Sequence, residues 1–207
     1  MVKSVQEEAI ETRTRARTRR AILQAAVDVF ATNKKASMSE VAQQAGVASS
    51  TLQRYFPERG DLVDALGHYV EDLVTEATER ARITEGTAIE AFERLAVELF
   101  ELRKAAILSF TDETFETEVA TAADAVTKDG VGPDEEVQED ADIAFYELIE
   151  RGHEDGTIDP RITPIWAQNL LWSTLYAGWA YSTVTRVSNF EALGMAIYSL
   201  RKAVGQR

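Results

Sequence analysis

Apolar residues recur at helical spacing along most of this chain of 207 residues, and no segment shows the sustained alternation typical of a β-strand. The first clear apolar stripe consists of Ile22, Leu23, Ala26, Val27 and Phe30. These residues share one face of a helix that we expect to begin near Arg13 and to end at Asn33, since Asn tolerates a left-handed backbone. The same spacing predicts roughly nine helices, so the expected fold class is all-α.

A capping-box pattern and a glycine predict two short helices after the first one. Ser37 and Glu40 have the Ser-x-x-Glu spacing in which each side chain satisfies the backbone N–H of the other residue. Gly46 is expected to end the second helix, and helical spacing resumes from Val47 to Phe56, before Pro57. Two short helices joined by a tight turn form a candidate helix-turn-helix motif.

Residues 61–207 are expected to form a helical domain that follows an N-terminal domain of residues 1–60. Its later helices are predicted to end at Gly152, to begin again at Thr163-Pro164, and to finish with a helix over 189–204. The acidic stretch 129–142 is interpreted as a loop and a helix start, with Pro133 in the first turn. A cation or metal site in this stretch is the alternative.

Composition excludes several classes of protein. Hydrophobic residues make up 45% of the chain, enough for a packed core, and there is no cysteine, which excludes disulfides and thiolate metal sites. The N-terminal residues lack the apolar core of an export signal, so we expect a cytoplasmic protein. The uncharged run 162–185 holds several hydroxyl and amide side chains and is therefore interpreted as a buried helix, with no membrane partner.

Charge is distributed unevenly along the chain. The net charge is −13, yet residues 1–60 carry ten basic and six acidic residues. The acidic remainder argues against a general binder of polyanions, whereas the basic N-terminal segment is suited to phosphates.

Catalytic motifs are missing from the sequence. There is no Gly-x-Ser-x-Gly elbow and no phosphate-binding loop, and the two histidines, His68 and His153, do not form a His-Glu-x-x-His zinc pair. We therefore expect no enzyme, no cofactor and no metal.

The second helix of the candidate motif carries side chains that suit base recognition. A helix over Ser49 to Tyr55 should bury Leu52 and expose Ser49, Ser50, Gln53 and Arg54. Arg54 can pair with guanine and Gln53 with adenine in the major groove, and hydroxyl groups suit phosphates.

Three segments in series resemble one family. Arg19-Arg20 with AILQAAVDVF, then SEVAQQAGV, then TLQRYFPERGDL resemble the DNA-binding signature of tetracycline-repressor-like (TetR) regulators over about residues 15–66. Four residues differ from those usual in the family: Asn33 stands in place of Gly, Ala48 in place of Ser, Gln53 in place of Tyr, and Arg59 in place of Lys. Without a Ser at position 48, Ser49 or Ser50 would cap the helix.

The resemblance and the residues together give the expected contacts with double-stranded DNA. They are Ser37, Ser49, Ser50, Thr51, Gln53, Arg54, Tyr55 and Arg59. Gln53 and Arg54 are expected to read bases, and Arg59 is expected to bind a phosphate. Residues 12–20 hold five arginines and no acid, which leaves open either a DNA-binding arm or a solvated helix end.

The resemblance also implies a homodimer and a small-molecule effector. Uncharged helical stripes predict a dimer interface of Trp172, Tyr176, Trp179, Thr183, Phe190, Leu193, Ile197 and Leu200. Aromatic residues on the middle helices are candidates for the effector pocket: Phe92, Phe100, Phe110, Phe145, Tyr146 and Trp166. The expected protein is a repressor with a palindromic operator. The alternatives are a helical enzyme or carrier with an incidental motif, and a regulator that senses no ligand.

Overall fold

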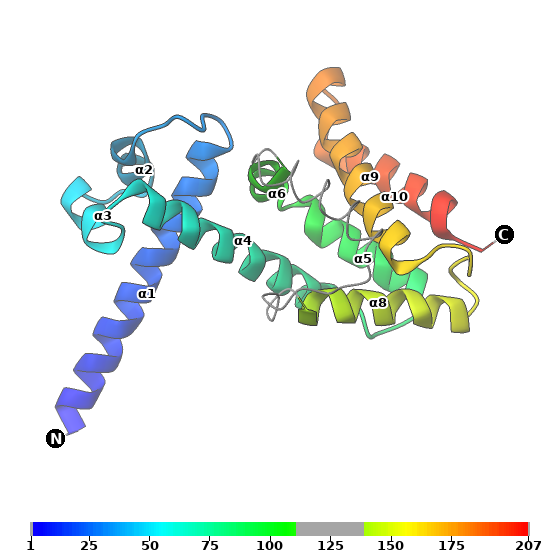
Figure 1. Ribbon diagram of the computed structural model, residues 1–207, viewed down its shortest axis with the longest axis horizontal. Coiled ribbons are helices and arrows are strands. Elements are labelled where there is room, and N and C mark those ends of the chain that lie inside the picture. The colour runs from blue at the N-terminus through cyan, green and yellow to red at the C-terminus, as the bar shows by residue number, and fades with distance from the viewer. Residues whose placement is uncertain (1, 111–138, 207) are drawn as a thin grey trace, which may run out of the picture. The chain divides into compact units, whose positions relative to one another are not determined.

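The computed structural model describes residues 2–110 and 139–206 (Figure 1). Within these ranges it contains nine α-helices and no β-strand, as the all-α prediction requires. The helices are α1 (Val2–Phe30), α2 (Met38–Gln44), α3 (Ser49–Tyr55), α4 (Arg59–Ala81), α5 (Ala88–Phe100), α6 (Arg103–Phe110), α8 (Glu139–Glu154), α9 (Pro164–Thr185) and α10 (Asn189–Val204).

The described residues group into two compact units. The first unit contains the chain up to Val70 together with α6 from Lys104 onward, and the second contains Glu71–Arg103 with α8, α9 and α10. The expected division lay after residue 60, whereas the division between the units falls inside α4.

The first unit has an apolar core in which α1, α2, α3 and the start of α4 meet. Its large, fully buried side chains include Ile22, Leu23, Val27, Val41, Leu52 and Leu62. Each comes from the apolar stripe of its helix, so burial of these stripes holds α1, α2, α3 and the start of α4 together.

Two details at the ends of α1 differ from the sequence-based expectations. The helix begins at Val2, well before Arg13, and ends at Phe30. Asn33 does not have a positive φ; instead its Oδ1 accepts the backbone N–H of Lys35 at 3.1 Å. The turn after α1 is thus made by an Asn side chain and not by a left-handed backbone.

The second unit packs α5, α8, α9 and α10 around one core. Phe92 lies 5.9 Å from Phe145, ring centre to ring centre, and Phe100 lies 5.8 Å from Trp179. The Trp179 Nε1 donates to the backbone oxygen of Phe100 at 3.0 Å. Buried indole N–H groups need such a partner, and this bond joins α9 to the end of α5.

The connection between α8 and α9 is joined to the end of the chain. Ile158 and Gly205 form an isolated antiparallel bridge, and the Asp159 N–H donates to the Val204 oxygen at 2.9 Å. On the other side of this connection, the Asp155 Oδ2 accepts the Ala88 N–H at the start of α5 at 2.8 Å.

Two sequence-based questions concern larger features. Of the helices described, none has the length and apolar character that crossing a bilayer requires. The stretch 129–142 lies largely outside the described residues, including Pro133. Among the described residues, no group of three or more His, Asp or Glu side chains is arranged to hold a metal ion.

Candidate nucleic-acid interface and ligand cavity

The helix-turn-helix motif is formed by α2, a tight turn and α3. Ser37 caps α2 as predicted: its Oγ accepts the Glu40 N–H at 3.3 Å, and the Glu40 carboxylate accepts the Ser37 N–H at 2.7 Å. These bonds lower the pKa of Glu40, the backbone bond most. Gly46 has a φ of +68° in the turn, a conformation that glycine adopts readily. The Ser37 hydroxyl is therefore committed to this cap.

Helix α3 presents most of its predicted contact residues to solvent. Ser49, Ser50, Gln53 and Arg54 are exposed, and Leu52 is buried. Thr51 and Tyr55 are half-buried. Ala48 is the N-cap, without a side-chain hydrogen bond, so the expectation that Ser49 or Ser50 would cap the helix is wrong. The polar face of α3 matches the arrangement that reads base edges in a major groove.

Arginines from α1 gather beside the end of α3. The guanidinium groups of Arg15 and Arg54 lie 6.0 and 5.9 Å from the centre of the Tyr55 ring. Arg19 lies 5.5 Å from the Phe56 ring. The basic stretch of α1 is therefore continuous with the exposed face of α3, which gives that face a locally positive surface.

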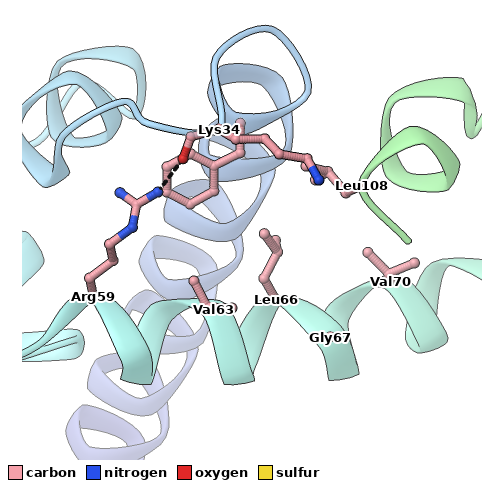
Figure 2. A pocket seen from close by; sticks show the side chains of 8 residues that line it. Lys34, Arg59, Val63, Leu66, Gly67, Val70 and Leu108 are labelled. Carbon is pink, nitrogen blue, oxygen red and sulfur yellow. Dashed lines mark hydrogen bonds between the residues drawn. The ribbon is translucent and has the colours of Figure 1, made fainter. Parts of the chain in front are cut away.

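Arg59 lies where its guanidinium is already engaged. It donates to the backbone oxygens of Lys34 and Ala36, and Figure 2 shows the bond to Lys34. The same group lies 4.5 Å from the centre of the Phe30 ring. This placement differs from the phosphate contact that the resemblance implied, because the donors are directed toward the chain's own carbonyl groups.

A small cavity of about 50 Å³ lies inside the second unit. Its polar lining includes the Asp142 carboxylate, which accepts from the Gln168 amide at 3.0 Å. Aromatic lining is supplied by Phe145 and Trp172. Aliphatic residues from α4, α5 and α9 complete the lining: Val74, Leu95, Leu99 and Leu171, with Thr78. A carboxylate in a lining that also contains aromatic side chains suits a cationic aromatic ligand.

Among the predicted pocket residues whose side chains the structure describes, Phe145 alone lines this cavity. Phe92 and Phe100 are buried in the core, and Tyr146 is half-buried, where burial and the negative charge of Asp142 raise its pKa. Trp166 is 55% exposed, and the side chain of Phe110 lies outside the description. The sequence reasoning missed Asp142, Gln168 and Trp172. A signal was available in Gln168 and Trp172, which lie one turn apart on a helix without charged residues.

The predicted interface residues divide between the core and the surface. Tyr176 and Phe190 are 58% and 88% exposed, Thr183 is exposed, and Leu193, Ile197 and Trp172 are half-buried. Trp179 and Leu200 are buried in the core of their own chain, so neither is available to a partner surface. The predicted stripe on α9 is therefore only partly an exterior face.

An exposed apolar surface nevertheless follows α9 and α10, which pack against each other. Its large members are Ile165, Trp166, Tyr176, Tyr181, Val184, Phe190, Met195 and Tyr198. Apolar patches of this kind on adjacent helices are typical of protein–protein contacts.

Comparisons with known proteins agree with this geometry. Residues 22–66 match the model of the family described as bacterial regulatory proteins, tetR family. The chain is 33% identical over 170 residues to the HTH-type transcriptional repressor LfrR of Mycolicibacterium smegmatis, covering 82% of each protein.

Solved structures extend the likeness to the whole fold. A crystal structure of LfrR from Mycobacterium smegmatis in complex with proflavine has a TM-score of 0.63 and 29% identity, covering 89% of this chain and 95% of that one. A TetR family regulator from Marinobacter aquaeolei VT8, at 20% identity, shares the fold with a TM-score of 0.65, over 94% of this chain and all of that one. With 33% identity to LfrR over 82% of each chain, and residues 22–66 matching the family model, the chain belongs to the TetR family of bacterial regulatory proteins.

Proposed function

We propose that this protein is a transcriptional repressor that binds a palindromic DNA operator as a homodimer and leaves it when a small molecule binds. The observation that carries the proposal is the exposed polar face of α3, with Gln53 and Arg54 beside the α1 arginines. The relatives reported above are regulators of transcription and not enzymes, which supports a binding function in the cytoplasm, where bacterial DNA is found.

Selection of bound duplexes from a random DNA library tests the DNA-binding part of this proposal. The purified protein should enrich a site with two-fold symmetry at near-physiological salt, since a symmetric dimer places two α3 helices on two half-sites. A variant with both Gln53→Ala and Arg54→Ala should lose the enriched site. Absence of any enriched sequence would contradict sequence-specific binding.

The exposed apolar surface on α9 and α10 supports the dimer. Phe190, Tyr198 and Tyr176 are large apolar side chains that are each more than half exposed in the single chain. Pairing two copies of this surface about a two-fold axis would remove these residues from water, which is the main favourable term in such associations.

The cavity of the second unit supports a cationic, planar aromatic effector. LfrR has been crystallised with proflavine, and in this chain Asp142 can supply a counter-charge in a cavity that Phe145 and Trp172 also line. A cavity of about 50 Å³ is smaller than a three-ring molecule needs, so binding must widen it. A ligand that prefers the widened state can shift the protein toward it and thereby couple to DNA binding.

A fluorescence titration with proflavine tests this effector class. Asp142→Asn should weaken proflavine binding by at least about tenfold, because the counter-charge is lost. Glu147→Gln is the matched control, since Glu147 is an exposed carboxylate on the same helix outside the cavity. Equal affinity of both variants and the original protein would contradict the assigned site.

A further inference from the structure

Tyr55, the last residue of α3, is approached by arginines from two helices. The guanidinium group of Arg15, on α1, lies 6.0 Å from the centre of the Tyr55 ring, and that of Arg54, on α3, lies 5.9 Å from it. At these distances an aromatic ring attracts a cation. One side chain therefore links the expected base-reading residue of α3 to the basic stretch of α1.

The Tyr55 ring is better anchored than the two arginines that it contacts. Tyr55 is half-buried, whereas Arg15 and Arg54 are exposed. Leu52, one turn before Tyr55, and Phe56, which follows it, are both buried in the first unit. Because packing holds the chain on both sides of Tyr55, the ring gives two long, solvent-exposed side chains a fixed surface to lie against.

A guanidinium group that lies against a ring can still read a base. Its N–H donors lie in the plane of the group, so a contact through its face leaves them for hydrogen bonds. An arginine in solvent loses rotamer freedom when it pairs with guanine, and this loss of entropy lowers the affinity. A ring that already restricts Arg54 leaves less freedom to be lost when DNA binds.

The two charges near one ring also favour a particular kind of partner. Arg15 and Arg54 repel each other in the absence of an anion, because both are positively charged. A phosphate beside Arg15 would offset this repulsion while Arg54 pairs with a base. DNA presents both groups together, since its backbone borders the groove in which the base edges lie.

We propose that Tyr55 is a positioning residue, whose ring holds Arg54 in place to read a base and holds Arg15 beside it to meet a phosphate. The inference rests on the proposed function, because it concerns how the same surface binds the operator. A direct contact of Tyr55 with the DNA backbone would use its hydroxyl group. The positioning role needs the aromatic ring and not the hydroxyl.

Operator binding by two variants of Tyr55 separates these roles. Tyr55→Phe keeps the ring and should bind the selected operator within about twofold of the original protein. Tyr55→Leu keeps an apolar side chain without the ring. It should weaken operator binding by at least about fivefold and relax the preference at the base position that Arg54→Ala also relaxes. Tyr55→Met replaces Tyr55→Leu if thermal unfolding shows that the latter does not fold.

A double-mutant cycle shows whether the ring acts through the two arginines. In protein that carries both Arg15→Ala and Arg54→Ala, Tyr55→Leu should change the affinity for the operator by less than about twofold, because the side chains that the ring positions are gone. Lowered salt keeps the binding of this weakened protein measurable. A merely structural role of Tyr55 would weaken binding equally in both backgrounds and leave the base preference unchanged.

Three results would overturn the positioning role while the original protein still selects a symmetric operator. They are an equal loss of affinity in Tyr55→Phe and Tyr55→Leu, an unchanged base preference in Tyr55→Leu, and equal effects of Tyr55→Leu with and without the two arginines. If the original protein selects no operator, the proposed function fails, and the positioning role fails with it.

Discussion

The guanidinium group of Arg59 lies over the ring of Phe30, 4.5 Å from its centre, and thereby ties the start of α4 to the end of α1. Its hydrogen bonds to the Lys34 and Ala36 oxygens hold the turn that leads into Ser37, the cap of α2. Arg59 therefore holds in place the turn that precedes the helix-turn-helix motif.

Replacing Arg59 by Ala should lower the free energy of unfolding by about 1–3 kcal/mol, because a cation–π contact and two charged hydrogen bonds are lost. Urea unfolding measures this change. The slope of log affinity for DNA against log salt should stay the same, since no phosphate contact is removed. A slope reduced by about 0.9, the value for one phosphate, would restore the phosphate role implied by the resemblance.

Arg54→Ala should weaken binding to the selected operator by about 1–3 kcal/mol and relax the preference at one base position of each half-site, because a base contact is lost. Binding assays on operators substituted at each position measure both effects. Arg82→Ala, an exposed arginine of the second unit, is the control. Uniform weakening on all sequences would identify Arg54 as a phosphate contact.

Removing both Arg15 and Arg19 by substitution with Ala should reduce the salt slope of DNA binding by about 2, if each guanidinium neutralises one phosphate beside α3. Arg13→Ala with Arg17→Ala removes the same charge from residues that helical geometry directs away from Arg15 and Arg19. Deletion of residues 1–16 removes the first part of the arm, including Arg13 and Arg15. Equal slopes for the two double variants would leave the arm without a specific role.

Phe190→Glu should convert the dimer to a monomer, because a charge placed on an 88% exposed apolar side chain would have to be buried in the interface. Light scattering after size-exclusion chromatography should then give the chain mass of 23.0 kDa in place of twice that mass. Val97→Glu makes the same change at an exposed apolar residue on α5 and should not alter the mass.

Acid should destabilise the cap of α2 through Glu40. The Ser37 hydrogen bonds lower the pKa of this carboxyl below its ordinary 4.5, so its stabilising effect is fully present above pH 4.5 and is lost as the pH falls through the lower, folded-state value. Glu40→Gln keeps a side-chain oxygen that can accept a hydrogen bond but removes the titratable carboxyl group. The urea midpoint of this variant should therefore fall less than that of the original protein between about pH 6 and pH 3. An equal fall in the urea midpoints of the variant and the original protein would contradict this role of Glu40.

Local sequence signals predicted the elements whose cause is local. The Ser37–Glu40 pair, the Gly46 turn and Thr163-Pro164 act within a few residues, and the structure has all three as predicted. Which side of α9 faces the core could not be predicted from neighbouring residues alone. That helix carries no charge on any face, so its sequence does not indicate whether Tyr176 or Trp179 is exposed. Packing against Phe100 buries Trp179.

The ligand cavity and the role of Arg59 depend on residues far apart in the chain. Asp142 meets Trp172 only because α8 and α9 pack together, and Arg59 meets Phe30 only because α4 crosses the end of α1. The spacing of apolar residues along the chain does not predict such contacts. The polar face of α3 is different, since one buried Leu52 determines which neighbours remain exposed.

The bridge between Ile158 and Gly205 also has a consequence for biosynthesis. The amides of Ala88 and Ile89 at the start of α5 are bonded by Asp155 and Thr157, whose connection is in turn bonded to Val204 and Gln206. Val204 and Gln206 are synthesised after α5, α8 and α9, so the second unit completes these hydrogen bonds late, whereas α1 to α3 can assemble while the chain is still emerging.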